Sequence, residues 1–96
     1  MGTISLSKYA PVIRDKETGQ QIYDSIKEMK PESDVVTIDF KDIVTMATFC
    51  AKQIFGKLYM ELNPEVFFSN IKIINANDDV KLIIRMGIQN AIETIW

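Results

Sequence analysis

The sequence predicts an α/β fold in which strands and helices alternate as β-α-β-α-β-α, with a mostly parallel sheet of three or four strands and three helices. Short apolar runs at 3–7, 35–40 and 71–74 have the length of strands. Between and after them, apolar residues recur at spacings of three and four, as on one face of a helix. The chain of 96 residues is long enough for a single domain, residues 1–96, with one hydrophobic core.

The first third of the chain predicts one strand and one helix. Residues 3–7 alternate polar and apolar side chains, as in a strand with one buried face. We expect residues 8–14 to form a connection. A helix follows with Asp15 as its N-cap, and it ends before Pro31, because proline disfavours helical geometry in the residue before it. Gly19 weakens this helix by about 1 kcal/mol relative to alanine, so its presence indicates close packing.

The middle of the chain predicts a buried strand followed by an amphipathic helix. Residues 35–40 begin with a near-continuous apolar run, which predicts a central strand covered on both faces. A polar loop follows, and either Thr45 or Thr48 is expected to cap the helix. The apolar face of the helix continues until the Asn-Pro pair at 63–64. Gly56 lies within this helix and indicates a close approach of another element.

The last third predicts a helical turn, a strand and a helix. Residues 64–69 begin with proline, which is favoured at the first position of a helix. Residues 71–74 form a short strand, and Asn77 or Asp78 is expected to cap the last helix, whose apolar face runs over 80–95. Strands separated by helices of this length are typical of βα units and a parallel sheet.

Charge and composition exclude several classes of partner. The chain has 11 basic and 13 acidic residues and a net charge of −2, and its basic residues do not cluster. Nucleic acid and anionic membranes both require a positive patch, so we expect neither as a partner. Histidine is absent, which removes the usual general base and the commonest metal ligand, and no cofactor is expected. The single cysteine, Cys50, fits a reducing, cytoplasmic compartment.

The loop from Asp39 to Thr48 is where we place the function. Asp39 marks the end of the central strand, and ligands of open α/β sheets gather outside the carboxyl ends of strands. Asp39 and Asp42 form a carboxylate pair that could hold Mg²⁺, with water completing its coordination. The alternative is that they stabilise turns by accepting backbone N–H groups, and this is favoured because no other ligand types accompany them.

A few other side chains have two interpretations each. Cys50 is either a nucleophile or a small buried hydrophobe, and its place on the apolar face of the helix favours burial. Phe67 and Phe68 are adjacent, and neighbours rarely both point inward, so one of them is expected to be exposed. Tyr9 and Trp96 either anchor an interface or cover the edge of the core.

Several segments together carry a family pattern. Residues 35–43 have the sequence Val-Val-Thr-Ile-Asp-Phe-Lys-Asp-Ile, and a threonine-bearing loop separates them from Phe49 and from Ile-Phe-Gly-Lys-Leu-Tyr at 54–59. Residues 73–80, Ile-Ile-Asn-Ala-Asn-Asp-Asp-Val, add a strand, a turn and the start of a helix. On these segments the chain resembles the STAS-like domains of unknown function found in bacteria, and the resemblance covers roughly residues 3–92.

The resemblance implies a small α/β regulatory domain, similar in fold to the STAS domains of anti-sigma-factor antagonists. In those antagonists a strand leads into an Asp-Ser-Ser-Gly loop before a helix, and a kinase resembling histidine-kinase ATPases phosphorylates a serine there. Here Ala47 stands in place of the aspartate, Thr48 in place of the first serine, and Phe49 in place of the second serine, which is the acceptor. The acceptor of the relatives is therefore missing, and the nearby hydroxyl groups belong to Thr45 and Thr48.

Thr48 is the candidate phosphoacceptor. A phosphate at the N-terminus of a helix is favoured by the free N–H groups and by the helix dipole. The alternative is that its hydroxyl simply caps the helix, which typically contributes about 1 kcal/mol and is the commoner role.

Three functions are compatible with the sequence. The resemblance favours a non-enzymatic regulatory module that docks onto a protein partner, for which a histidine-kinase-like ATPase is a candidate. Docking would use the loop with Asp39, Asp42, Thr45 and Thr48 together with the start of the following helix. The alternatives are a small Mg²⁺-dependent enzyme that uses Asp39 and Asp42, and a homo-oligomeric structural protein whose last helix supplies a dimer interface.

Overall fold

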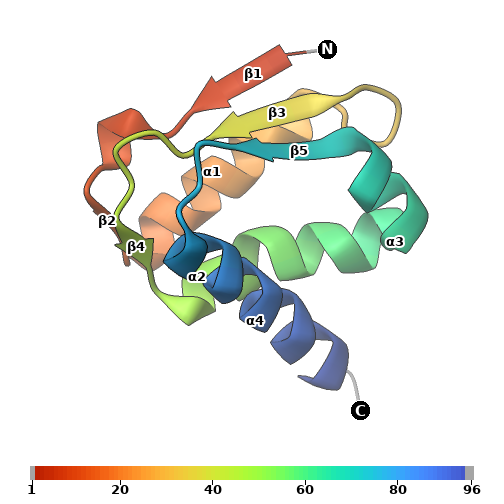
Figure 1. The fold of residues 1–96 in the computed structure, drawn as a ribbon. Coiled ribbons are helices and arrows are strands. Elements are labelled where there is room, and N and C mark those ends of the chain that lie inside the picture. The colour runs from red at the N-terminus through yellow and green to blue at the C-terminus, as the bar shows by residue number, and fades with distance from the viewer. Residues whose placement is uncertain (1, 95–96) are drawn as a thin grey trace.

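The structure is a computed structural model that describes residues 2–94 (Figure 1). Its elements in chain order are β1 (Gly2–Ser5), the 3-10 helix η1 (Ser7–Tyr9), β2 (Val12–Ile13), α1 (Lys16–Glu28), β3 (Val36–Asp39), β4 (Thr45–Met46), α2 (Thr48–Ala51), the π-helical segment η2 (Lys52–Gly56), α3 (Lys57–Asn70), β5 (Ile71–Ile74) and α4 (Asp78–Thr94). Segments α2, η2 and α3 follow one another directly and form one long helix that is continuous as far as Asn63. The predicted α/β alternation of strands and helices is confirmed.

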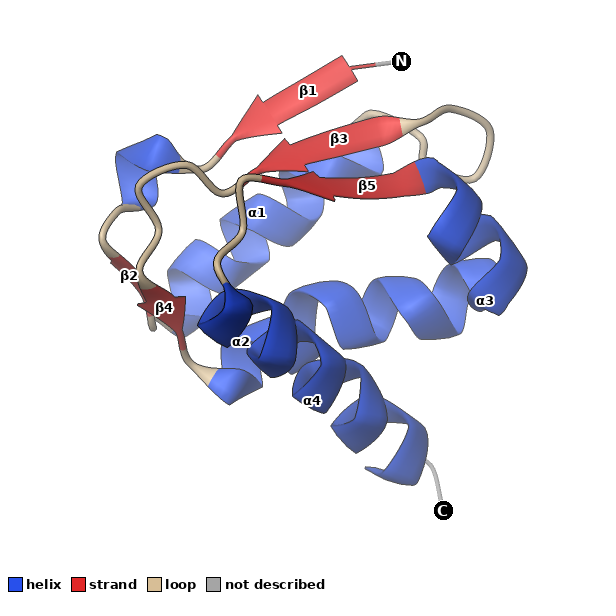
Figure 2. Cartoon of the chain, viewed as in Figure 1, coloured by secondary structure: helices blue, strands red, loops and turns tan. Residues whose placement is uncertain are grey.

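The main sheet is parallel and contains β1, β3 and β5, with β3 in the centre (Figure 2). Ile4 of β1, Ile38 of β3 and Ile73 of β5 are in register across it. The predicted central position of the strand at 35–40 is confirmed. The carboxyl end of β3 therefore opens into the middle of one edge of the sheet, where the candidate loop begins.

The helices cover only one face of this sheet, so the prediction that the central strand is covered on both faces is wrong. Val36 and Ile38 of β3 are fully buried, whereas Thr37, between them, is half-exposed and Thr3 of β1 is exposed. The reason lies in the strand order, because both crossovers step across the sheet in the same direction. Crossovers of the same hand then place their helices on the same face, and the opposite face stays polar. Figure 1 shows this layering, with the helices below the sheet.

A second, two-stranded parallel sheet pairs β2 with β4. Val12 is in register with Thr45, and Ile13 is in register with Met46. The expectation that residues 8–14 form only a connection is wrong at this point. A strand of two residues has no periodicity from which it could be recognised, and it forms because the loop after β3 folds back onto it.

Small residues bring α4 against the long helix. A Cβ atom on Gly87 of α4 would lie 2.6 Å from backbone atoms of Ala51 and Lys52. A Cβ atom on Gly56 would lie 2.8 Å from the Cβ of Ala91. The close approach predicted at Gly56 is therefore confirmed. This close packing lets the N-terminal end of α4 reach the loop after β3.

The helix was predicted to end at the Asn-Pro pair, and the structure interrupts α3 there with a kink. Asn63 has a φ angle of 70° and a ψ angle of 160°, and a further helical segment begins at Pro64. The side chain of Asn63 accepts a hydrogen bond from the backbone N–H of Val66 at 3.0 Å, and so caps that segment.

None of the helices within residues 2–94 combines the length and the apolar character that a membrane span requires.

The aromatic side chains divide between the core and the surface. Phe67 is 3% exposed and Phe68 is 64% exposed, which confirms the expectation that one of the two is exposed. Tyr9 is half-buried against the edge of the core, and its hydroxyl donates a hydrogen bond to the side chain of Gln21 at 3.5 Å. Trp96 lies outside the described residues.

Candidate functional site

The loop after β3 is anchored to the core by every third residue. Phe40, Ile43 and Met46 are buried, whereas the intervening Asp42 and Val44 are exposed. The backbone N–H of Phe40 donates to the carbonyl of Ile74 at 2.9 Å, and that of Val44 donates to the carbonyl of Pro11 at 2.8 Å. The loop is thus an ordered surface with its apolar anchors in the core, and it lies on the outside of the molecule as the sequence predicts.

Asp39 ties this loop to the neighbouring loop after β5. Its Oδ1 atom accepts one hydrogen bond from the Asn75 side chain and one from the backbone N–H of Lys41, both at 2.9 Å. These two bonds, that from Asn75 first, hold the pKa of the Asp39 carboxyl below its usual range. The arrangement matches the turn-stabilising role that was considered for this aspartate.

Asp42 has a different environment. It is exposed and has a φ angle of 70°, a left-handed conformation that aspartate tolerates in turns. Among residues 2–94, no group of three or more His, Cys, Asp or Glu side chains is arranged to hold a metal ion. At this end of β3, the Asp39 carboxylate therefore stabilises the loop, whereas the Asp42 carboxylate faces the solvent.

Two side chains at the start of α4 hold the rest of the loop. The Oδ1 atom of Asn77 accepts a hydrogen bond from the Val80 N–H at 2.8 Å, which confirms Asn77 as the cap of this helix. Its Nδ2 atom donates to the carbonyl of Val44 at 2.9 Å. Two residues further, Asp79 accepts a hydrogen bond from the Thr45 hydroxyl at 2.6 Å. The loop therefore cannot move without disturbing the N-terminal end of α4.

Neither Thr45 nor Thr48 caps the helix that follows, so that prediction is wrong. The helix begins at Thr48, the N-cap position is occupied by Ala47, and no side chain makes a cap hydrogen bond there. The reason is that Ala47 continues the extended conformation of β4, with its N–H bound to the carbonyl of Ile13 at 2.8 Å. Strand pairing, rather than the preference of a side chain, decides where the helix starts. Thr48 is half-buried in the first turn.

Cys50 is a buried small hydrophobe, as expected. It is fully buried, and its thiol donates a hydrogen bond to the carbonyl of Asp15 at 3.6 Å. Burial, and next the nearby Asp15 carboxylate, raise the pKa of the thiol. A raised pKa keeps the sulfur protonated near neutral pH, which disfavours nucleophilic chemistry.

The side chains that sequence analysis did not select are two exposed apolar residues. Val44 is 59% exposed, and Phe49, in the first turn of α2, is 53% exposed. Phe49 lines a shallow depression of about 310 Å³ together with Lys16, Lys52 and Gln53. A signal for Phe49 exists in the sequence, because it lies off the apolar face that Cys50 and the later core residues of this helix define.

Comparison with known proteins gives one match. The family described as STAS-like domain of unknown function (DUF4325) matches residues 18–81, which extend from α1 through the candidate loop to the first turn of α4. No curated protein and no solved structure matches the chain.

Proposed function

The chain belongs to the family of STAS-like domains of unknown function, and on this premise we propose that it is a non-enzymatic, cytoplasmic regulatory module that docks onto a protein partner. Docking uses the segment from Asp39 to Thr48 and the first turn of the helix that follows. We call residues 39–49, which end with Phe49 in that first turn, the docking segment. The observation that carries the proposal is the exposure of Val44 and Phe49 in this segment.

The exposed apolar groups are presented by a backbone that is already ordered. Hydrogen bonds from Asn77 to Val44 and from Thr45 to Asp79 join the segment to α4. Binding through such a surface requires little ordering of the loop, so less of the interaction free energy is lost to entropy. Aromatic side chains that enter a pocket of the partner commonly dominate the binding energy, and Phe49 has the exposure for this role.

The charges around Phe49 suggest the partner's chemistry. Lys16 and Lys52 line the same depression. A complementary surface would place an apolar pocket over Phe49 and an acidic side chain opposite Lys16. The resemblance to antagonist domains makes a histidine-kinase-like ATPase the first partner to test.

The test is affinity capture from the native cell, followed by binding measurements with the purified captured protein. We expect Phe49→Ser to weaken binding about 30-fold, as for a typical hot-spot aromatic residue. Phe68→Ser is the matched control, because it also removes an exposed phenyl ring but lies outside the docking segment. Equal binding by wild type and Phe49→Ser would contradict the proposal, provided that far-ultraviolet circular dichroism shows both variants to be folded.

Regulation by phosphorylation is a finer version of the proposal, with Thr48 as the acceptor. Thr48 is the first helical residue, where N–H groups of the first turn lack partners within the helix and favour an anion. The hydroxyl of Thr45 already donates to Asp79. With the cognate kinase, Thr48→Val should abolish phosphate incorporation, and Thr45→Val should retain it. Incorporation into Thr48→Val at the wild-type level would rule this version out.

A homodimer is a second candidate, favoured by one specific observation on α4. Leu82 and Met86, one turn apart, are 49% and 44% exposed. The sequence predicted a dimer interface on this helix from its isoleucine content and its surplus of apolar positions, without selecting Leu82 or Met86. Light scattering at high protein concentration tests this candidate, and a strict monomer would remove it.

A Mg²⁺-dependent activity at Asp39 and Asp42 has less support, since Asp39 already accepts two hydrogen bonds. A metal that binds only the folded protein must raise the melting temperature. We expect excess Mg²⁺ to leave the melting temperature unchanged, and a clear increase that Asp42→Asn abolishes would support the enzyme instead.

A further inference from the structure

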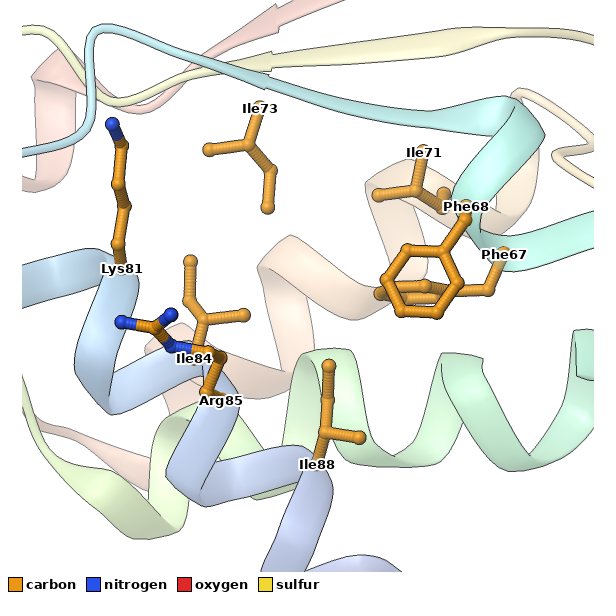
Figure 3. Close-up of a pocket in the computed structure, with 8 residues that line it drawn as sticks. All are labelled: Phe67, Phe68, Ile71, Ile73, Lys81, Ile84, Arg85 and Ile88. Atoms are coloured by element: carbon orange, nitrogen blue, oxygen red, sulfur yellow. The ribbon is translucent and has the colours of Figure 1, made fainter. Parts of the chain in front are cut away.

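A groove of about 250 Å³ lies between α4, β5 and the C-terminal part of α3, and none of its lining residues belongs to the docking segment (Figure 3). Its buried lining consists of Phe67, Ile71 and Ile84. Its more exposed lining consists of Phe68, Ile73 and Ile88. An apolar depression of this kind, with a few polar groups, is the usual form of a small-molecule site.

The aromatic wall of the groove is held in place. The ring of Phe68 packs edge-to-face against Phe67, with ring centres 5.4 Å apart, and against Tyr59, at 6.0 Å. Tyr59 and Phe67 also pack edge-to-face, at 5.5 Å. Phe68 is 64% exposed, yet these contacts hold its ring in a defined orientation. The wall therefore exists before any ligand arrives.

The groove is polar at one end only. Lys81 and Arg85, one turn apart on α4, both lie on the side of the groove away from the two phenylalanine rings in Figure 3, with the charged ends of their side chains pointing in different directions. Both cations are exposed, and neither takes part in an ion pair among the described residues. A ligand that matches this arrangement has an anionic head at the α4 end and an apolar body directed toward Phe67 and Phe68.

We propose that this groove binds a medium-chain carboxylate of about eight carbon atoms. A chain of medium length is required because isoleucine side chains of the lining separate the cations from the two phenylalanine rings (Figure 3). The carboxylate accepts hydrogen bonds from Lys81 and Arg85. A protein partner would have to bury about 800 Å² on each side for a stable complex, which a groove holding one short chain does not supply.

The test uses sodium octanoate as the probe, with 1-octanol as a matched neutral ligand of the same chain length. Methyl-resolved NMR of isoleucine-labelled protein should show shifts at Ile73, Ile84 and Ile88, and none at Ile22 or Ile26, which lie buried in α1. For a ligand of about ten non-hydrogen atoms, we expect a dissociation constant of about 1 mM or tighter. 1-Octanol should bind more weakly than octanoate.

Variants separate the charged end from the apolar end. Lys81→Gln and Arg85→Gln should each weaken octanoate binding about threefold to fivefold, and should leave 1-octanol binding unchanged. Arg14→Gln, which removes an exposed charge outside the groove lining, is the matched control and should have no effect. Phe68→Ala removes part of the wall and should weaken both ligands.

Several results would overturn the proposal. One is equal affinity for octanoate and 1-octanol, because the cations would then play no part. Another is a shift pattern that spares the groove methyl groups. A third is that the protein sediments with anionic phospholipid vesicles, whereas free octanoate causes no shift of the methyl signals. The cations would then bind a membrane surface. The comparison of the two ligands uses the wild-type protein, so it holds even where a variant fails to fold.

Discussion

Replacing Asn77 by alanine should destabilise the protein and loosen the docking segment together. The Asn77 side chain acts at two places: its oxygen accepts a hydrogen bond from the Val80 N–H at 2.8 Å, and its amide group donates to the Val44 carbonyl at 2.9 Å and, less closely, to the Ile43 carbonyl at 3.5 Å. The first caps α4, and the second holds the loop after β3. A single side chain therefore links the last helix to the proposed docking surface.

The expected cost follows from these two contacts. Loss of a helix cap of this type costs about 1 kcal/mol. Loss of the hydrogen bond to the Val44 carbonyl costs about a further 1 kcal/mol. The free energy of unfolding should thus fall by about 2 kcal/mol, which lowers the melting temperature of a domain of this size by about 10 °C.

A serine at the same position separates the two contributions. Serine is a good helix cap but is too short to replace the amide donor, so Asn77→Ser should lose only about half as much stability. Urea unfolding followed by circular dichroism measures the free energies, and hydrogen exchange at the Val44 N–H measures the loosening of the loop. The reasoning fails if Asn77→Ala stays within about 0.5 kcal/mol of wild type, or if the serine variant loses as much as the alanine variant.

Gly87→Ala should destabilise the protein by about 2 kcal/mol in urea unfolding, because overpacking against backbone atoms 2.6 Å away costs about 3 kcal/mol and improved helix propensity returns about 1 kcal/mol. Gly19→Ala should leave the stability nearly unchanged, since its Cβ would meet only the end of the flexible Gln53 side chain. An equal loss of stability in Gly19→Ala and Gly87→Ala would contradict this explanation. The hydrogen bonds that lower the pKa of Asp39 stabilise the folded protein above about pH 4, and this stabilisation is lost as the pH falls through the lowered pKa. Asp39→Asn should therefore flatten the dependence of the melting temperature on pH in that range. Cys50 should react with a thiol reagent only after unfolding, and rapid labelling of the native protein would contradict its burial.

The sequence predicted the elements with a strong internal period or a local stop signal. The apolar run at 35–40 and the apolar face of the long helix are properties of neighbouring residues, and the structure contains both elements. The effects of proline and asparagine on the backbone are confined to nearby residues, so the interruption of the helix at Asn63 could also be predicted. The close packing at Gly56 could be predicted because glycine is unfavourable in a helix unless space requires it, whereas at Gly19 only the end of the Gln53 side chain lies close.

The surface position of the candidate loop was predicted, but its contacts were not. The loop between Asp39 and Thr48 does lie on the surface at the carboxyl end of the central strand. The partners of Asp39 and Thr45 are Asn75 and Asp79, which are more than 30 positions away along the chain, and no local pattern specifies such pairs. The exposed Phe49 was missed because apolar residues are expected to be buried.

What the sequence determined by itself is the alternation of strands and helices, the central place of β3 and the family, because each depends on residues close together in the chain. The tertiary structure alone decided that one face of the sheet stays open, since this depends on the direction of both crossovers. It also decided where the second helix begins. The pairing of β4 with β2 keeps Ala47 extended, and this overrides the capping preference of the threonines on either side. Contacts between distant segments are stronger determinants there than local propensity.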